Sequence, residues 1–424
     1  MRILIHGLNF APELVGVGKY TGEMAEWLAA RGHQVRAVTA PPFHPQCQVA
    51  AGFSAWRYAR QDFNCPRAQH LQPNSAFNSG YLRVLRCPLW VPLHPSAIKR
   101  ILHLASFALA SFPVMLSQCV WRPEVVLVIE PTLFSLPAAW LTSHFSGARS
   151  WLHVQDFEAD AGFELGLLHS TGLRCAIQSA EKKLMSGFAR VSTISQKMLA
   201  KLVQKGVSPS ACCLFPNWVD TAAIYPLTRP SPLRAELGIS ANEIVALYSG
   251  TMARKQGLEI MAEAARRLCG TSGLRFVFCG EGPGKAALAR LTSAFPNVQW
   301  IPLQPFERLN DLLNLADIHL LPQRADAADL VMPSKLTGML AGGRPVVATA
   351  AANTQLAHAV EGRGIVVEPG DAAAFADAVE LLARDPDWRE RLGRRAREYA
   401  IAELEKETVL YRFEQDLLQF VTAG

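Results

Sequence analysis

Two stretches of the chain, far apart in the sequence, combine residue types that can hold phosphate groups. In each, an apolar segment leads through glycines into an amphipathic segment. The segments are 2–7 with Gly16, Gly18 and 19–30 in the first half, and 243–249 with Gly250, Gly257 and 258–268 in the second. A strand that passes through glycine into a helix leaves backbone N–H groups and the positive helix end facing a phosphate or diphosphate. The repetition predicts two nucleotide-binding folds that face each other across a cleft, with the chemistry between them.

The composition is that of a globular chain with large cores. Of the 424 residues, 50% are apolar, which predicts about two or three domains. The cysteines form no Cys-x-x-Cys pair and no zinc-type spacing with histidine, so we expect a reduced, cytoplasmic setting. His6, Asn9 and Pro12 interrupt the short apolar run at the N-terminus, so we interpret it as the first strand and not as a signal peptide.

One segment accounts for the net charge of +6. Residues 63–123 contain no Asp or Glu, and their basic residues are Arg67, Arg83, Arg86, Lys99, Arg100 and Arg122. These basic residues are not interleaved with stacking aromatic residues, so nucleic acid is not an expected partner.

Within this segment, 101–121 carries no formal charge and is long enough for a transmembrane helix. Polar residues dilute it, however, and it leads directly into an expected strand at 125–129. A spanning helix would place that strand on the wrong side of the membrane. We therefore expect 63–123 to rest on the inner-membrane surface through an apolar, cationic face. The alternative is a buried helix flanked by solvated arginines.

Apolar periodicity predicts alternating strands and helices in both halves. In the first half the expected strands are 3–6, 34–39, 125–129, 150–154 and 190–194, with helices near 19–30, 98–118, 134–145, 173–187 and 195–205. In the second half the expected strands are 243–249, 274–279, 297–301, 317–321, 345–349 and 364–367, and helices at 388–399 and 402–420 end the chain. This order is typical of doubly wound parallel sheets. We interpret 41–97, which lacks the pattern, as a long functional loop.

A break after residue 215, followed by a proline-rich stretch, divides the chain into two expected domains. The N-terminal domain, 1–215, contains the cationic segment and is expected to face the membrane, where it would present a second substrate. The C-terminal domain, 216–424, is expected to bind the nucleotide, and its last helix is a candidate to cross back onto the first domain.

Five motifs, in this order, give the chain a resemblance to a known family. They are Pro-Asn-Trp-Val-Asp at 216–220, Ser-Gly-Thr-Met-Ala-Arg-Lys-Gln-Gly-Leu at 249–258, Gly-Glu-Gly-Pro at 280–283, Met-Pro-Ser-Lys-Leu-Thr at 332–337 and Ala-Gly-Gly-Arg-Pro-Val-Val-Ala at 341–348. Together they resemble family-4 retaining glycosyltransferases of the GT-B fold over nearly the whole chain. The resemblance implies an α/β architecture of two Rossmann-like, doubly wound domains facing across a cleft.

Such a reaction releases a nucleoside diphosphate from the anomeric carbon, so negative charge grows on the β-phosphate and positive charge grows on the sugar ring. Cations should face the phosphate. Arg254 and Lys255, in the turn after Gly250, and Lys335, at a predicted helix start, are the candidates, with Ser334 as N-cap and hydroxyl donor. Gly16 and Gly18 are expected to let the backbone of the first domain approach the donor from the opposite side. Ordinary surface and turn roles are the alternatives.

Carboxylates are the candidates for the sugar end of the reaction. Glu281 lies where members of the family pass the nucleoside, and it is a candidate to bind a sugar hydroxyl or an outward-facing cation. Asp156 follows the strand 150–154, where the family often has His-Asp, and is a candidate to orient the acceptor hydroxyl or to stabilise the charged ring. Glu130 is the alternative catalytic residue. We interpret His153 as a packed histidine and not as a base.

The chain departs from the family pattern at the sugar half of the site. The two glutamates that the family spaces as Glu-x7-Glu fall on Leu330 and Gly338, and Asp326 and Asp329 are the nearest carboxylates. Ile129 stands where the family often has histidine before Glu-Pro. No Asp-x-Asp motif lies in the expected cleft loops, and cations can neutralise the diphosphate, so we expect no metal and no other cofactor.

The leading hypothesis is a retaining, metal-independent glycosyltransferase in exopolysaccharide biosynthesis. The resemblance implies a GDP-sugar donor, with GDP-fucose as the first candidate, and a polyprenyl-diphosphate-linked saccharide acceptor. We expect the enzyme to be cytoplasmic and peripherally attached to the inner membrane. The alternatives are a 2-epimerase-like enzyme of the same fold and a non-catalytic nucleotide-sugar-binding partner, which the missing glutamates favour.

Overall fold

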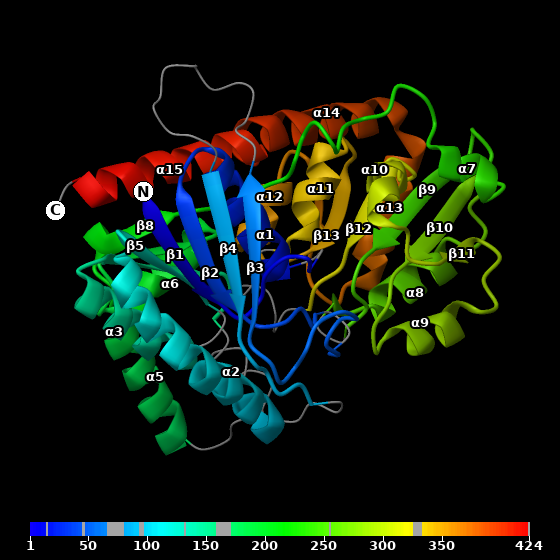
Figure 1. Ribbon diagram of the computed structural model, residues 1–424. Coiled ribbons are helices and arrows are strands. Elements are labelled where there is room, and N and C mark those ends of the chain that lie inside the picture. The colour runs from blue at the N-terminus through cyan, green and yellow to red at the C-terminus, as the bar shows by residue number, and fades with distance from the viewer. Residues whose placement is uncertain are drawn as a thin grey trace, which may run out of the picture. The chain divides into compact units, whose positions relative to one another are not determined.

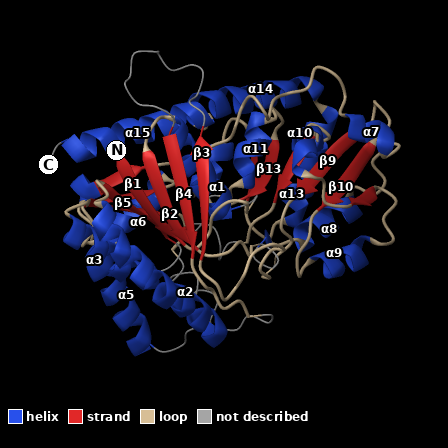
Figure 2. Ribbon diagram, in the orientation of Figure 1, coloured by secondary structure: helices blue, strands red, loops and turns tan. Residues whose placement is uncertain are grey.

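The computed structural model describes residues 1–13, 16–44, 47–65, 80–92, 97–130, 133–157, 171–253, 256–324 and 333–422. The chain divides into two compact units, Met1–Pro216 with Leu410–Gly424, and Asn217–Val409. Each unit is built on one β-sheet with helices packed against it (Figures 1 and 2).

The sheet of the first unit has eight strands. In spatial order they are β3 (Ala59–Cys65), β4 (Gly80–Arg86), β2 (Gln34–Thr39), β1 (Arg2–Gly7), β5 (Val125–Glu130), β6 (Arg149–Val154), β7 (Arg190–Thr193) and β8 (Cys212–Leu214). Neighbouring strands are parallel except β3, which runs antiparallel to β4. The helices are α1 (Gly16–Ala30), α2 (Ala97–Ser117), α3 (Leu136–Ser146), α5 (Thr171–Met185) and α6 (Gln196–Gln204), with 3-10 turns η1 (Gln118–Trp121), η2 (Leu133–Ser135) and η3 (Pro209–Ala211).

The interpretation of 41–97 as a loop is wrong in part, because β3 and β4 lie within it. In β4 the apolar residues Leu82 and Val84 are buried and alternate with half-buried residues such as Arg83. The arginines interrupt the apolar alternation of β4, so the sequence pattern does not indicate a strand there. The edge strand β3 is largely exposed, so its composition is polar. The first sheet is therefore mixed and not wholly parallel.

The sheet of the second unit has six strands, all parallel to their neighbours. In spatial order they are β11 (Val298–Ile301), β10 (Leu274–Cys279), β9 (Ile244–Ser249), β12 (Ile318–Leu321), β13 (Val346–Thr349) and β14 (Gly364–Val367). The helices are α7 (Pro232–Glu236), α8 (Glu259–Arg267), α9 (Lys285–Thr292), α10 (Leu309–Leu313) after the 3-10 turn η5 (Phe306–Arg308), α11 (Lys335–Ala341), α12 (Gln355–Val360), α13 (Ala372–Arg384) and α14 (Pro386–Glu403).

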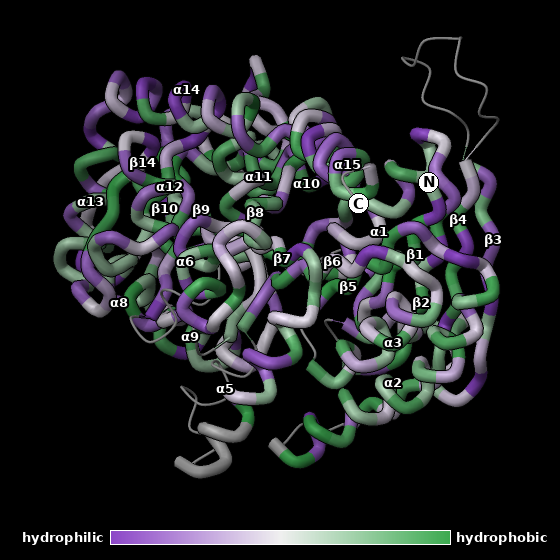
Figure 3. The backbone as a smooth tube through the Cα atoms, turned by 90° about the vertical axis from the view of Figure 1, so that its left-hand side faces the viewer, coloured by the Kyte–Doolittle hydropathy of each residue, from purple (hydrophilic) through white to green (hydrophobic). Residues whose placement is uncertain are grey.

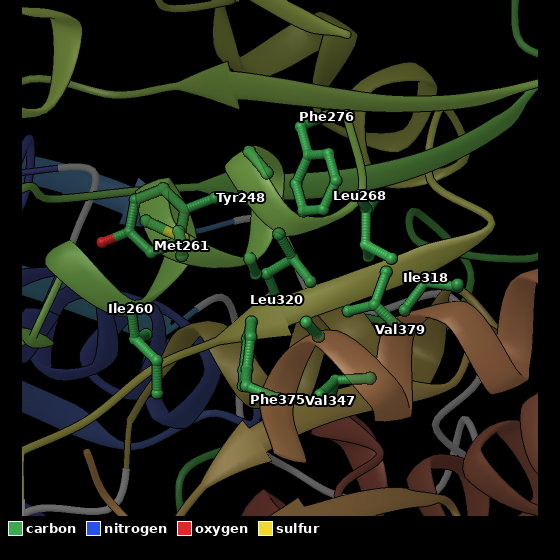
Figure 4. Close-up of a cluster of buried hydrophobic side chains, with 14 of the residues drawn as sticks. Tyr248, Ile260, Met261, Leu268, Phe276, Ile318, Leu320, Val347, Phe375 and Val379 are labelled. Carbon is green, nitrogen blue, oxygen red and sulfur yellow. The ribbon is translucent and has the colours of Figure 1, made fainter. Parts of the chain in front are cut away.

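Both faces of this second sheet are buried. Alternate residues of β9 point to opposite faces: Ala246 and Tyr248 pack with α8 and α13, whereas Val245 and Leu247 pack on the other side. Figure 4 shows the first of these cores, where Phe276 and Leu320 lie among the helix residues. The covering helices fix the strand ends, and the site described below is built from those ends.

The last helix, α15 (Lys406–Thr422), begins in the second unit and belongs to the first unit from Leu410 onward. In the first unit Phe413 stacks on Phe215 with ring centroids 3.9 Å apart and meets Trp151 edge-on. Glu414 is buried, and its carboxylate accepts hydrogen bonds from Arg31 and His33. The end of the chain is thus anchored in the first unit by aromatic packing and by charge.

Helix α2 has one face on the first sheet and one face exposed. On the inner face, Phe107 and Ser111 are buried, and the Ser111 hydroxyl lies 3.1 Å from His6 Nε2 of β1. Residues Ile98–Trp121 are long and apolar enough to cross a membrane by length and composition alone, and 28% of the 18-residue apolar window within them is buried. Hydrophobic residues run along much of α2 (Figure 3). The buried inner contacts hold α2 on the sheet as a half-buried helix.

Candidate functional site

Two glycine turns pack against each other at the carboxyl edge of the second sheet. Gly250 follows β9 with φ +127°, and its N–H donates to the Cys279 carbonyl at 2.9 Å. A Cβ on Gly280 would lie 2.1 Å from the Gly250 carbonyl oxygen, and one on Gly282 would lie 2.5 Å from that of Met252. The Gly-Glu-Gly motif after β10 is therefore required by backbone contact with the turn after β9. The two turns form one rigid edge.

Lys335 lies beside this edge. Its side chain runs past Gly250, where a Cβ would be 3.4 Å from Lys335 Cδ, and its Nζ lies 4.1 Å from the centroid of the Tyr248 ring. Among the described residues the ammonium has no hydrogen-bond partner. Burial lowers the pKa of Lys335 to about 7. A buried basic side chain at a glycine turn, with no hydrogen-bond partner among the described residues, is suited to bind an anion such as a diphosphate.

His319 of β12 is the second buried basic group here. Its side chain is fully buried, and neither ring nitrogen has a hydrogen-bond partner in the described part of the chain. Burial, with smaller contributions from the charges of Arg344 and Lys335, lowers the pKa of His319 to about 3. The ring is therefore neutral, and it adds no charge to the site near neutral pH.

Ser334 differs from its predicted capping role, whereas Glu281 meets an outward-facing cation, which is one of its two predicted roles. Ser334 occupies the N-cap position before α11, but its side chain makes no capping hydrogen bond, so the prediction of a capping hydroxyl is wrong. Its carbonyl instead accepts from the Thr337 hydroxyl at 2.9 Å. Glu281 is exposed, and its carboxylate accepts a hydrogen bond from Lys285 Nζ at 2.5 Å, one turn along α9. The cation that Glu281 meets is thus in its own unit.

Several predicted residues lie outside the described residues: Arg254, Lys255, Asp326, Asp329 and Leu330. Gly338, the second position of the expected glutamate pair, is described and lies in α11. A Cβ there would be 3.2 Å from Leu313 Cδ1, so this position faces the packed interior. No cluster of three or more His, Cys, Asp or Glu side chains suited to a metal ion occurs within the described ranges.

The glycine turn of the first unit has a different environment. Glu13 is buried, and its Oε1 accepts from the backbone N–H groups of Phe43 and His44 at 3.0 and 3.1 Å. Its Oε2 lies where a side chain on Gly18 would begin, since a Cβ there would be 2.3 Å away. The space that a side chain at residue 18 would need is therefore filled by Glu13, which explains why residue 18 is glycine. The approach of the Gly18 backbone to the donor stays a prediction.

Gly16, unlike Gly18, has little beside it among the described residues. It begins α1 with φ +64°, and a Cβ there would meet only His44 Nε2 at 3.9 Å among the described atoms. Asn9 donates to Glu13 at 3.0 Å, and Arg86, also buried, donates to the carbonyls of Ala40 and Ala11. The turn is thus held from several segments, and among the described atoms its Gly16 end has the least around it.

The two candidate catalytic carboxylates follow neighbouring strands of the first sheet. Glu130 is the last residue of β5, is buried, and lies opposite Val154 of β6. Asp156 comes two residues after Val154 and is half-buried. Both therefore lie at one carboxyl edge of the sheet, where they can orient a hydroxyl or stabilise positive charge.

His153 does not join them. Its ring is buried, its Nδ1 lies 2.9 Å from the Ser192 hydroxyl, and its Nε2 lies 2.9 Å from Gln155. Burial lowers the pKa of His153 to about 3. A histidine that stays neutral and has a hydrogen-bond partner at each ring nitrogen is a packing residue, which agrees with the sequence interpretation.

Sequence reasoning missed two buried groups beside the candidate turns: Glu13 at the turn of the first unit and His319 at that of the second. Glu13 had a signal: a glutamate at the glycine turn of the first half, close to Gly16 and Gly18. His319 had none, because a single histidine in a short apolar strand is indistinguishable from an ordinary core residue.

Comparison with known protein families matches both halves of the chain. Residues 15–218 match a family described as glycosyl transferase 4-like domain, and residues 243–385 match one described as glycosyl transferases group 1. The chain is 41% identical to the putative colanic acid biosynthesis glycosyl transferase WcaI of Escherichia coli K12, over 98% of this chain and 100% of that protein.

Solved structures resemble the whole chain at low sequence identity. Sucrose-phosphate synthase from Thermosynechococcus elongatus matches with a TM-score of 0.74 and 18% identity, covering 100% of both chains. The Anabaena protein HepE in complex with UDP matches with a TM-score of 0.67 and 14% identity, covering 99% of this chain and 100% of that one. These likenesses confirm the predicted fold class.

Proposed function

Because this chain belongs to the family of group 1 glycosyltransferases with a 4-like N-terminal domain, we propose that it moves a sugar from a nucleoside diphosphate sugar to a lipid-linked saccharide. The transfer retains the anomeric configuration and uses no metal ion or other cofactor. By analogy with the colanic acid relative, the product is an exopolysaccharide, and GDP-fucose is the donor to test first.

The observation that carries this proposal is the buried ammonium of Lys335 beside the Gly250 turn. Negative charge grows on the departing β-phosphate during transfer, and a preorganised cation in a low-dielectric site stabilises such charge strongly. In the proposal Arg254 and Lys255 supply further positive charge. Together these cations take the role that a metal ion has in other phosphate chemistry. The departing phosphate then accepts the proton of the acceptor hydroxyl on the same face of the sugar.

For the sugar half of the site we propose the carboxyl edge of the first sheet. Asp156 is the first candidate to orient the acceptor hydroxyl or to stabilise the ring charge, and Glu130 is the second. Glu130 is the more deeply buried of the two, so a structural role competes with catalysis more strongly there.

For the acceptor we propose a polyprenyl-diphosphate-linked saccharide reached from the inner-membrane surface. The support is the outer face of α2 and η1, where apolar residues recur at helical spacing. The exposed members are Ile98, Leu102, Leu109, Phe112 and Val120, and Ala105 and Leu116 continue the same stripe. Leu109 is 77% exposed. Such a stripe with Lys99 and Arg100 at its start is typical of a helix that lies in the surface of an anionic leaflet.

The packing of α2 favours surface attachment over a membrane span. Its inner face makes buried contacts with β1, and Phe107 lies against His6 there. The adjacent helix α3 adds exposed aromatic residues, Trp140 and Phe145. If only the exposed faces of α2 and α3 enter the membrane surface, the contacts of α2 with the sheet are kept.

The donor proposal is tested by thermal unfolding with GDP and UDP, followed by a panel of nucleotide sugars with membrane extract in which nucleoside diphosphate release is measured. We expect one nucleotide to raise the melting temperature and one nucleotide sugar to turn over. The variant Arg254→Ala/Lys255→Ala should lose turnover. If neither nucleotide stabilises the protein, the donor assignment fails.

The membrane proposal is tested by flotation with vesicles that contain phosphatidylglycerol. Leu109→Glu should reduce binding by at least about tenfold, because burying a leucine side chain contributes about 1.5–3 kcal/mol. The matched control is Val203→Glu, which changes an exposed apolar residue of α6 in the same unit. Equal binding by the two variants would contradict the assignment of this face.

A non-catalytic nucleotide-sugar-binding role is the second candidate, because Gly338 faces the interior where the family carries a glutamate. That role predicts stabilisation by a nucleotide without release of nucleoside diphosphate from any donor in the panel.

A further inference from the structure

We propose that donor binding takes up a proton at Lys335, so that this lysine is neutral in the empty site and charged beneath the bound diphosphate. The inference rests on the proposed function, since it concerns the same site. It goes further because it makes the donor affinity depend on pH through one named side chain.

The geometry around Lys335 disfavours a charge in the empty site. Its Nζ lies over the face of the Tyr248 ring, its stem passes the bare backbone of Gly250, and the helix α11 begins at Lys335 itself. No acceptor among the described residues lies within hydrogen-bonding distance. An aromatic face offsets only part of the desolvation of an ammonium ion. Burial also lowers the pKa of Lys335 to about 7, which likewise favours the neutral form of the lysine in the empty site.

A diphosphate at the glycine turn reverses this balance. It brings negative charge and acceptor oxygens to Lys335, which has none among the described residues, and this favours the charged form of the lysine. Above pH 7, where the lysine of the empty site is mostly neutral, binding must therefore be accompanied by proton uptake. The affinity should fall about tenfold per pH unit above 7 as long as the lysine is charged in the complex.

The other titratable groups that face Lys335 in the described part of the chain do not account for such an uptake. Burial raises the pKa of Tyr248, so the phenol stays protonated and its hydroxyl donates to the Thr251 carbonyl at 2.6 Å. The pKa of His319 is about 3, so its ring stays neutral. Arg344, which faces His319, is charged throughout.

The experiment is calorimetric titration with GDP and UDP at pH 8 in two buffers of different protonation enthalpy. At this pH the terminal phosphate of the nucleotide is already ionised. We expect an apparent binding enthalpy that differs between the buffers by close to one proton taken up per nucleotide. At pH 6 the uptake should be lost, because Lys335 is then charged before binding, and any remaining difference is a proton release from the terminal phosphate, whose second pKa is about 6.

Three variants separate the possible sources of the proton. Lys335→Arg, which is always charged, should bind without proton uptake, and Lys335→Met should bind more weakly and also without uptake. His319→Leu should retain the uptake. Nucleotide binding by the unaltered protein without uptake at pH 8, or uptake that persists in Lys335→Arg, would overturn the inference and leave the proposed function standing. If no nucleotide binds at all, both fail.

Discussion

The two glycine turns, one in each unit, share a sequence pattern and differ in what occupies the space beside the glycine. In the first unit the carboxylate of Glu13 fills the space at Gly18 and accepts backbone hydrogen bonds from another loop. In the second unit the Lys335 side chain borders Gly250, and its ammonium has no hydrogen-bond partner among the described residues. The first turn is satisfied internally, whereas the second is not.

The difference shows that a glycine turn after a strand does not by itself identify a phosphate site. The same absence of a Cβ can admit part of the protein's own chain or part of a ligand. The partners of the neighbouring side chain distinguish the two cases: a carboxylate with its donors in place marks a structural joint, and a buried basic side chain without acceptors among the described residues marks a binding site.

The largest effect should come from Glu13→Ala. The change leaves the backbone N–H groups of Phe43 and His44 and the amide of Asn9 without their acceptor, and it removes a negative charge near the buried Arg86. Breaking a buried, hydrogen-bonded charge of this kind costs about 3–5 kcal/mol of unfolding free energy. Urea unfolding measures the loss. The exposed Glu26→Ala on α1 is the control and should change stability by less than about 0.5 kcal/mol.

Gly18→Ala should have the next largest effect on stability. Its Cβ would lie 2.3 Å from the Glu13 carboxylate, so we expect a loss of about 2–3 kcal/mol from overpacking. In the Glu13→Ala background the contact with the carboxylate is gone and only the Cβ of residue 13 remains close, at 2.7 Å, so the combined loss should fall short of the sum by at least about 1 kcal/mol. Additive losses in urea unfolding would contradict the account of why residue 18 is glycine.

The sequence was sufficient to predict both doubly wound folds, because the central strands β1, β5 and β9 are buried on both faces and are continuous apolar runs. It was also sufficient to predict that Gly250 and Lys335 come together, since the motifs put each of them after the carboxyl end of a strand in the second sheet. It was not sufficient for β3 and β4, whose polar residues reflect an edge position that only the three-dimensional sheet defines. The sequence was also not sufficient to predict that Glu13 lies beside Gly18, because only the folded turn shows which side chain fills the space there.

Lys335→Met should stabilise the protein while it weakens nucleotide binding. A buried lysine whose pKa is about 7 in the folded state is protonated at a higher pH in the unfolded chain, so the unfolded state binds more protons between these values. The stability of the unaltered protein therefore rises with pH across that range and is lowest below pH 7. We expect the methionine variant to be more stable by about 1–3 kcal/mol at pH 6, with the gap narrowing toward pH 10. A methionine variant that is less stable at pH 6 would mean that Lys335 has an anionic partner in the empty protein.

The smallest effect should come from Glu281→Ala, although Glu281 lies on the same rigid edge as Gly250. Only the backbone of Glu281 contributes to this edge, since its carbonyl accepts a hydrogen bond from the Met252 N–H at 2.8 Å. Its side chain is exposed and pairs with Lys285. Exposed ion pairs one helical turn apart contribute only about 0.3–0.5 kcal/mol, so the unfolding free energy should change by no more than this. Nucleotide affinity, measured by calorimetry, should stay within about twofold, since a screened side chain outside the glycine turn contributes little.

The matched variant Lys285→Ala removes the other partner of this ion pair and should show the same small changes in stability and affinity. A loss of tenfold or more in Glu281→Ala alone would show that the carboxylate leaves Lys285 to bind the ligand, and the comparison of the two turns would then have to include the side chain of the Gly-Glu-Gly motif as well as its backbone.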